Sequence, residues 1–236
     1  MKRKLATSIV LILFILAGIQ VQAEEQTRKV DSFSSISLRI SANVHLEQGE
    51  KQNLELVAKS STLEDLITEV KDGELIIRFP TKTLFWSSFK PGEITIYITI
   101  PEIAGLVVSG SGNIIADGEI KTKKLDLGLS GSGNIKLSDL SAEQVKSTIS
   151  GSGNIHLAGK TAAQDLSVTI SGSGSVKALD YNADDVTVRI SGSGNVGIQA
   201  NKNLYVRVSG SGNVNYKGKP LIDSAISGSG KVKSAD

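Results

Sequence analysis

Apolar and polar residues alternate strictly along much of the second half of the chain. The clearest apolar runs take every second position in segments 125–129, 166–170, 186–190 and 204–208. A period of two is typical of a strand that buries one face. The positions between hold residues such as Asp126, Thr187 and Arg207, which predicts that these side chains face solvent.

Each of these runs leads into the motif Ser-Gly-Ser-Gly, which is usually followed by Asn and then by Ile or Val. Seven copies begin at Ser109, Ser130, Ser150, Ser171, Ser191, Ser209 and Ser227, with spacings of 21, 20, 21, 20, 18 and 18 residues. A regular period of this length indicates one supersecondary unit that is repeated and stacked. We therefore expect residues 109–236 to form tandem turns, here called rungs, of about 18–21 residues each.

The alternation resumes after every motif with an Ile or Val five positions beyond the first Ser. Each repeat thus contains a strand, a tight corner, a second strand and a polar return. In an antiparallel meander the same corner would appear on alternate edges, whereas a complete repeat every 20 residues returns each motif to one edge. The sequence predicts an all-β parallel β-helix, a solenoid whose inward side chains stack about 4.8 Å apart.

The corner motif has a structural explanation of its own. A corner between two strands needs positive φ or close chain approach, and Gly provides both. The asparagines that follow the glycines are expected to stack as a ladder, interrupted by Ser175 and Lys231. Gly172→Val and Ile170→Asp should both destabilise the fold, and unchanged melting temperatures would contradict this arrangement.

Residues 24–108 are less regular but still contain alternating, strand-like segments. We expect one domain over residues 24–236, in which 24–108 form irregular first turns and a cap over the apolar end of the solenoid. A separate N-terminal domain is the alternative. Residues 63–70 fit a short helix or the approach to a strand equally well.

The first 23 residues have the pattern of a secretory signal peptide. Lys2, Arg3 and Lys4 precede an apolar stretch over 9–19, and small residues lead to Ala23, where cleavage is predicted. An uncleaved anchor is the alternative, although the apolar stretch is shorter than a spanning helix needs. We expect an exported protein in the periplasm or on the outer cell surface, without stable membrane insertion after cleavage.

Composition argues against several kinds of partner and chemistry. Removing 1–23 leaves 23 basic residues (26 − 3) against 24 acidic ones, so no general electrostatic attraction to nucleic acid is expected. The chain has no Cys, and its two histidines, His45 and His156, do not have zinc-site spacing. The Gly-rich motifs run into strands rather than helices, unlike phosphate loops, and they lack the recurring Asp of calcium-binding repeats. No catalytic residue, metal or cofactor is expected.

One aromatic cluster stands out. Phe85, Trp86 and Phe89 fall between Pro80 and Pro91, in a segment expected to be a loop. Aromatic side chains on a loop are candidates for partner binding, and the alternative is that they cover an end or a side of the solenoid. The four tyrosines, Tyr97, Tyr181, Tyr205 and Tyr216, are expected to support the side faces.

The signal-like segment, the strand-rich first part and the tandem Ser-Gly-Ser-Gly-Asn-Ile rungs resemble a family of secreted, Bacteroidetes-type proteins of Gram-negative bacteria. It is the head GIN domain family of putative auto-transporter adhesins (DUF2807), and the similarity covers roughly residues 30–234. The resemblance implies a right-handed parallel β-helix and no established ligand or catalytic residue. Many relatives begin with a lipoprotein Cys, which this chain lacks.

The expected function is therefore a non-enzymatic adhesin or ligand-binding module at the cell envelope. Cell-surface or matrix carbohydrate, or a protein, is the expected partner. The alternatives are a periplasmic structural or envelope-maintenance protein and a carbohydrate-active enzyme on a β-helix scaffold. Lys231 and Lys233 near the C-terminus should discourage edge pairing, so a monomer or weak dimer is expected.

Overall fold

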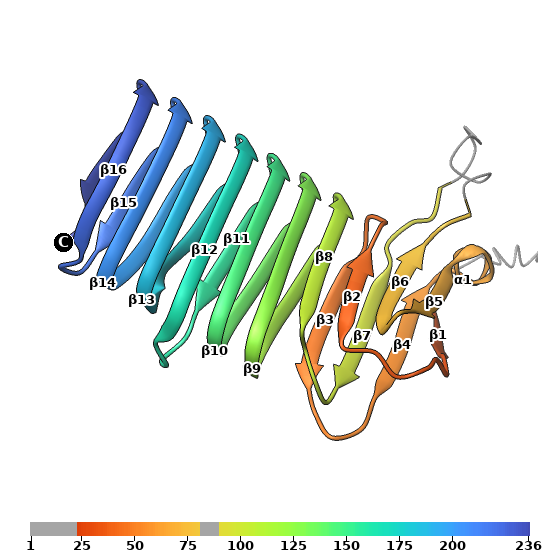
Figure 1. Cartoon of the computed structure of the whole chain (residues 1–236). Coiled ribbons are helices and arrows are strands. Elements are labelled where there is room, and N and C mark those ends of the chain that lie inside the picture. The colour runs from red at the N-terminus through yellow and green to blue at the C-terminus, as the bar shows by residue number, and fades with distance from the viewer. Residues whose placement is uncertain (1–22, 81–89) are drawn as a thin grey trace, which may run out of the picture.

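The chain forms the parallel β-solenoid that the repeats predict. The computed structural model describes residues 23–80 and 90–236, and it places all their strands in one continuous 17-stranded sheet that coils through about six turns. The rungs stack along one axis, from β1 and α1 at one end to β16 at the other (Figure 1). Within the described ranges, no helix has the length and apolar character needed to cross a bilayer.

The strands follow the repeat closely. In chain order they are β1 (Glu24–Thr27), β2 (Ser35–Leu38), β3 (Asn43–Gln48), β4 (Asn53–Ala58), β5 (Ile67–Lys71), β6 (Glu74–Arg78), β7 (Thr95–Ile100), β8 (Gly105–Gly110), β9 (Asn113–Gly131), β10 (Asn134–Gly151), β11 (Asn154–Ala158), β12 (Ala163–Gly172), β13 (Ser175–Gly192), β14 (Asn195–Gly210), β15 (Asn213–Lys217), β16 (Leu221–Gly228) and β17 (Lys231–Ser234). The helix α1 (Ser60–Asp65) lies between β4 and β5.

Neighbouring rungs pair in parallel, with equivalent residues of the repeat opposite one another. Ile135, for example, pairs with Ile114 of the preceding rung and Ile155 of the following rung. The strand that enters each corner contributes to the pre-corner face, which runs from β8 through β9, β10, β12, β13 and β14 to β16. The strand that leaves each corner contributes to the post-corner face, which ends at β17.

The inward positions form an aliphatic core. Ile135, Ile155, Val168 and Leu204 are all fully buried, and each such side chain contributes roughly 1.5 to 3 kcal/mol to stability. Two positions of one inward column are serines, Ser147 and Ser224. Ser147 lies between Leu127 and Val168 and is fully buried, and its hydroxyl has no hydrogen-bond partner among the described residues.

Two glycines of each corner are required for different reasons. Gly172 has a φ of 127°, and a Cβ at this position would lie 2.5 Å from the carbonyl oxygen of Gly151 in the rung before. Gly174 has no such backbone requirement, but its Cβ would lie 2.6 Å from the carbonyl oxygen of Gly153. The first position thus needs the backbone freedom of Gly, and the second needs the space.

The asparagine ladder predicted after the corners is present and begins earlier than expected. Side-chain amides donate from Asn134 to Asn113 at 2.8 Å and from Asn154 to Asn134 at 3.0 Å. Asn213 donates to Asn195 at 3.1 Å, beyond the interruption at position 175. Asn113 also donates to Asn43 at 2.8 Å, so the ladder extends into the N-terminal part.

The N-terminal part continues the sheet with a mixed topology. β2 and β3 pair in parallel with β8 and β9, whereas β4 pairs antiparallel with β7, β1 pairs antiparallel with β4, and β5 pairs antiparallel with β6. Both interpretations of residues 63–70 are partly correct, because α1 ends at Asp65 and β5 begins at Ile67.

The sequence suggested that all four tyrosines support the side faces, but in the structure Tyr181 does not. Tyr181 is fully buried, and its hydroxyl donates to the carbonyl oxygen of Ala142 at 3.4 Å. Tyr97 and Tyr205 are 44% and 45% exposed. The expectation was wrong for Tyr181, because its ring fills the interior beneath a return between two faces. The strict alternation of the strands does not extend through such a return, so it could not predict which way the ring points.

Candidate functional site

The aromatic segment that contains Phe85, Trp86 and Phe89 lies outside the described residues. Its role as a partner-binding loop stays a prediction. The described residues present their side chains on the faces of the solenoid, where strand alternation and rung register decide which side chains meet.

The two histidines are not brought together. His45 and His156 share one column of the post-corner face, but Ile115 and Lys136 occupy the two rungs between them. The ring of His45 instead stacks on that of Tyr97, with centroids 5.2 Å apart and an interplanar angle of 20°. Among residues 23–80 and 90–236, no group of three His, Cys, Asp or Glu side chains could hold a metal ion.

A trough of about 440 Å³ runs across the pre-corner face in the C-terminal half of the solenoid. One side is the outward column formed in register by Thr169, Arg189, Arg207 and Ala225, on β12, β13, β14 and β16. The other side is the row of corner serines, which are Ser171, Ser191, Ser209 and Ser227. Strand alternation points the arginines outward, and the parallel register sets them on neighbouring rungs about 4.8 Å apart.

The two arginines have different electrostatic surroundings. Arg207 donates through both terminal nitrogens to the carboxylate of Asp223 on β16, at 3.2 and 2.9 Å. These hydrogen bonds lower the pKa of Asp223 and raise the pKa of Arg207. Arg189 is exposed and has no hydrogen bond or ion pair with any described residue.

The pair of arginines therefore carries more positive charge than the surrounding acids balance. Like charges directly opposite one another on neighbouring strands are unfavourable. An anionic group placed between the guanidiniums would relieve this repulsion, and the planar fork of Arg matches carboxylate, sulfate and phosphate oxygens. The trough can thus hold an anion by charge and by hydrogen bonding.

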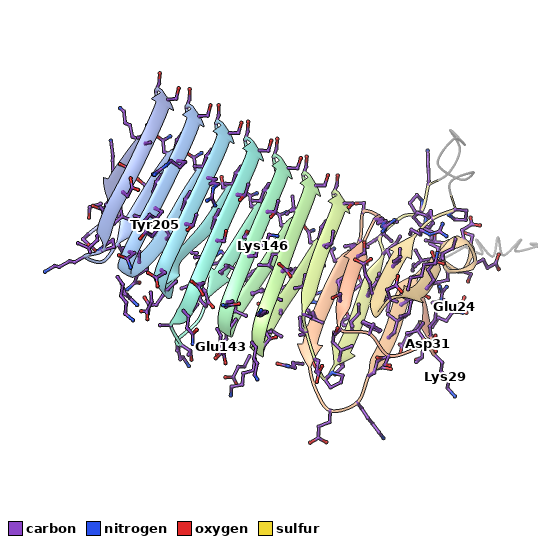
Figure 2. The ribbon with its side chains drawn as sticks, viewed as in Figure 1. Glu24, Lys29, Asp31, Glu143, Lys146 and Tyr205 are labelled. Atoms are coloured by element: carbon purple, nitrogen blue, oxygen red, sulfur yellow. The ribbon has the colours of Figure 1, made fainter. Side chains whose placement is uncertain are left out.

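Neutral groups beside the arginines suit a hydroxyl-rich ligand. The corner serines along the trough are exposed, and each offers one hydroxyl donor and two acceptor lone pairs. Tyr205 lies two residues before Arg207 on β14 and projects from the same face, as Figure 2 shows together with Lys146 farther along. An exposed ring next to arginines provides an apolar surface with a polar tip.

Sequence reasoning treated Arg189 and Arg207 alike, as ordinary outward positions that face solvent, and did not identify them as a pair. The signal that could have found the pair is their spacing, because two arginines 18 residues apart occupy the same position of consecutive 18-residue repeats. Composition alone could not show that only one of them has an acidic partner, since Asp223 belongs to the next rung.

Comparisons with known proteins agree with the fold. The model of the family described as putative auto-transporter adhesin, head GIN domain, matches residues 32–220. The crystal structure of a putative adhesin from Bacteroides fragilis superposes with a TM-score of 0.84 at 24% identity, covering 90% of this chain and 97% of that one. A putative adhesin from Parabacteroides merdae gives 0.68 at 21% identity, covering 92% and 98%.

A third solved relative has a different name. The crystal structure of a putative lipid binding protein from Parabacteroides distasonis superposes with a TM-score of 0.75 at 25% identity, and the match covers 92% of this chain and 98% of that one. No curated protein sequence is significantly similar to the chain. The family match spans most of the chain, from β2 to the loop before β16, and includes six of the seven corner motifs. The chain therefore belongs to the family of putative auto-transporter adhesins with a head GIN domain.

Proposed function

We propose that this chain is an exported, non-catalytic binding module of the cell envelope, an adhesin that attaches to acidic polysaccharide through the trough on its pre-corner face. The observation that carries the proposal is that Arg189 and Arg207 lie opposite one another on neighbouring strands, and that among the described residues only Arg207 has an acidic partner. The names of the family and of its solved relatives support adhesion as the general role.

The form of the trough favours a polymer over a small molecule. It is open and lies across four rungs, so a long chain can pass over it without threading. Carboxylate or sulfate groups would bind the guanidiniums, while sugar hydroxyls would exchange hydrogen bonds with the corner serines. The ring of Tyr205 offers an apolar surface to the face of a sugar.

Catalysis is not favoured by the groups at this site. Asp223 is the one carboxylate that contacts the trough arginines among the described residues, and its lowered pKa keeps it ionised at neutral pH. A glycosidase needs a second carboxyl group whose raised pKa lets it donate a proton. The trough provides a charge pair for binding and no acid and base pair for hydrolysis.

Enclosure of a lipid, which the name of the Parabacteroides distasonis relative suggests, is not favoured at the trough either. An acyl chain is held best in a pocket that removes most of its surface from water. The trough is an open surface depression next to two exposed cations. Acidic polysaccharide therefore fits its shape and charge better than an enclosed lipid.

The test is binding of the purified protein to immobilised alginate and dextran sulfate, with neutral dextran as the reference surface. Arg189→Gln should weaken binding to the acidic polymers about tenfold or more, because it removes a charge-assisted hydrogen bond. Lys146→Gln is the matched control, since it removes one exposed charge from the same face outside the trough. Equal effects of the two variants, or equal binding to neutral dextran, would contradict the proposal.

A further inference from the structure

The C-terminal rung, residues 217–236, leaves apolar side chains exposed at the end of the solenoid opposite α1 (Figure 1). Ile222 and Ile226 on β16 are 44% and 40% exposed. Their equivalents one rung earlier, Leu204 and Val208, are 0% and 3% exposed, because β16 covers them. Among the described residues, nothing covers β16 in the same way.

Leu221 shows that the apolar exposure of the last rung includes more than inward side chains left without a covering rung. It begins β16 at an outward position and is 78% exposed. The same column is polar in every earlier rung of the repeat, where it holds Lys124, Gln144, Asp165, Asp185 and Asn203. An apolar residue in a polar column adds nothing to the interior of the solenoid. It extends the apolar surface of the end onto the rim.

Positive charge surrounds this apolar end. The C-terminal rung contains Lys217, Lys219, Lys231 and Lys233 against two aspartates. Asp223 is engaged by Arg207. Asp236 accepts a hydrogen bond from the backbone N–H of Gly218. The four lysines make no ion pair within the described part of the chain.

We propose that the C-terminal rung is a docking surface for an anionic lipid bilayer. Exposed aliphatic side chains enter the boundary between headgroups and acyl chains, while nearby lysines attract anionic headgroups. A bilayer surface needs no enclosing cavity, so this site differs from the trough. The contact is peripheral and adds no spanning segment.

Charge distinguishes a bilayer from a second copy of the chain at this end. Two copies that met end to end would cover their apolar residues but would bring eight lysines, four from each copy, to one interface. Like charges at an interface oppose association, whereas anionic headgroups complement them. The rim therefore favours lipid over self-association.

The inference does not depend on polysaccharide binding, because Leu221 and the four lysines lie outside the trough, although Ala225, Ile226 and Ser227 of β16 line its last rung. Docking by this end would direct the opposite end of the solenoid away from the bilayer. The trough would then lie on a side face of the upright molecule, with its β16 end nearest the bilayer and its β12 end farthest from it.

The experiment is flotation of the purified protein with vesicles of phosphatidylglycerol and phosphatidylcholine in equal parts, compared with vesicles of phosphatidylcholine alone. The protein should float with the anionic vesicles and stay behind with the neutral ones. Leu221→Gln should weaken this partitioning about tenfold. The double variant Lys231→Gln with Lys233→Gln should weaken it about 25-fold, since each lysine near an anionic surface contributes about a factor of five.

The matched control is Lys123→Gln with Lys124→Gln, two exposed lysines of β9 far along the stack. It removes the same charge and should leave flotation unchanged. All variants carry the same N-terminal segment, so any lipid affinity of that segment cancels from the comparison. Leu221 and the four lysines are surface residues, and unchanged melting temperatures will show that the variants remain folded.

Three results would overturn the inference. The first is absence of flotation with anionic vesicles, and the second is flotation that the Leu221 and lysine variants do not reduce. The third is a dimer in sedimentation without lipid that Leu221→Gln dissociates, which would assign the surface to a second copy. Binding to alginate is measured on the same preparations, so a failure of lipid binding at the C-terminal rung is distinguished from a failure of polysaccharide binding at the trough.

Discussion

The N-terminal part, residues 23–108, and the tandem rungs that follow belong to the same sheet but differ in how their strands pair and turn. In the rungs, parallel pairing repeats with the same corner each time. In the N-terminal part, β2, β3, β7 and β8 keep this parallel register, but antiparallel strands and α1 lie beside them. Register is therefore common to both parts, and the Ser-Gly-Ser-Gly motif is not.

The first corner shows why the motif can be absent. Asn43 pairs with Asn113, so Ala42 stands where the later corners have their second glycine. Ala42 is buried and has a Cβ, whereas a Cβ on Gly112 would lie 2.5 Å from the carbonyl oxygen of Ile40. A side chain at Gly112 is excluded by the backbone oxygens of Ile40 and Ala42 in the corner on the neighbouring rung.

The largest expected effect comes from filling a stacked corner. Gly172→Val should lower the free energy of unfolding by about 3 to 5 kcal/mol, because it combines backbone strain with overpacking against Gly151. Chemical denaturation monitored by circular dichroism measures the loss. The comparison change at the first corner, Ala42→Gly, should cost only about 1 kcal/mol. Equal losses in the two variants would show that stacking of corners is not the reason for the glycines.

The next largest effect concerns alkaline pH and the interior of the rungs. Burial raises the pKa of Tyr181 to about 12, above its value of about 10 in the unfolded chain. The folded state favours the neutral phenol, so its contribution is complete below pH 10 and is lost as pH rises through 12. The loss should approach 2 to 3 kcal/mol. Urea unfolding at a series of pH values measures it.

Tyr181→Phe is the control for this titration, because it keeps the ring and removes the ionisable group. The difference in unfolding free energy between the two proteins isolates Tyr181 from the lysines and exposed tyrosines, which titrate in both. A difference that stays constant from pH 9 to 12 would mean that the phenol is accessible in the folded state.

Replacing Ser147, a buried polar side chain in an inward column, should stabilise the rungs. Ser147→Val removes a buried hydroxyl without a hydrogen-bond partner and adds apolar surface between Leu127 and Val168. The expected gain is about 1 to 2 kcal/mol, seen as a higher melting temperature. Thr148→Val, at the exposed neighbouring position, should change stability by less than about 0.5 kcal/mol. A lower melting temperature for Ser147→Val would refute the expected gain.

The smallest expected effect lies at the join between the two parts. Asn113→Ala removes the side-chain hydrogen bonds to Asn43 and Asn134. It should lower the free energy of unfolding by only about 1 kcal/mol, because both hydrogen bonds are partly exposed. Asn215→Ala, an exposed asparagine outside the ladder, should be neutral. If the two variants melt at the same temperature, the ladder contributes nothing to the join.

The periodic features of the fold were predictable, since they depend on local repetition. Inward Ile155, the glycine corner at Gly172 and the ladder from Asn113 to Asn134 all follow from alignment of the repeats. The buried Tyr181 was not predictable in this way, because it lies on a return whose length varies from rung to rung. Asn43 joined the ladder without a glycine motif to mark it.

The site was less predictable than the fold for a physical reason. A repeat pattern states which face a side chain takes, but the partner of each charge depends on the neighbouring rung. The pairing of Arg207 with Asp223 and the isolation of Arg189 among the described residues are properties of that register. The exposure of Leu221 likewise depends on what covers the last rung. The partner-binding role of the segment with Phe85, Trp86 and Phe89 stays a separate prediction.

The most direct test of the proposed role is protease accessibility on intact cells, compared with cells whose outer membrane has been permeabilised. An exported adhesin at the cell surface should be cleaved, or labelled by antibody, on intact cells to the same extent as after permeabilisation. Protection of the protein until permeabilisation would contradict the adhesin proposal and favour the periplasmic structural role.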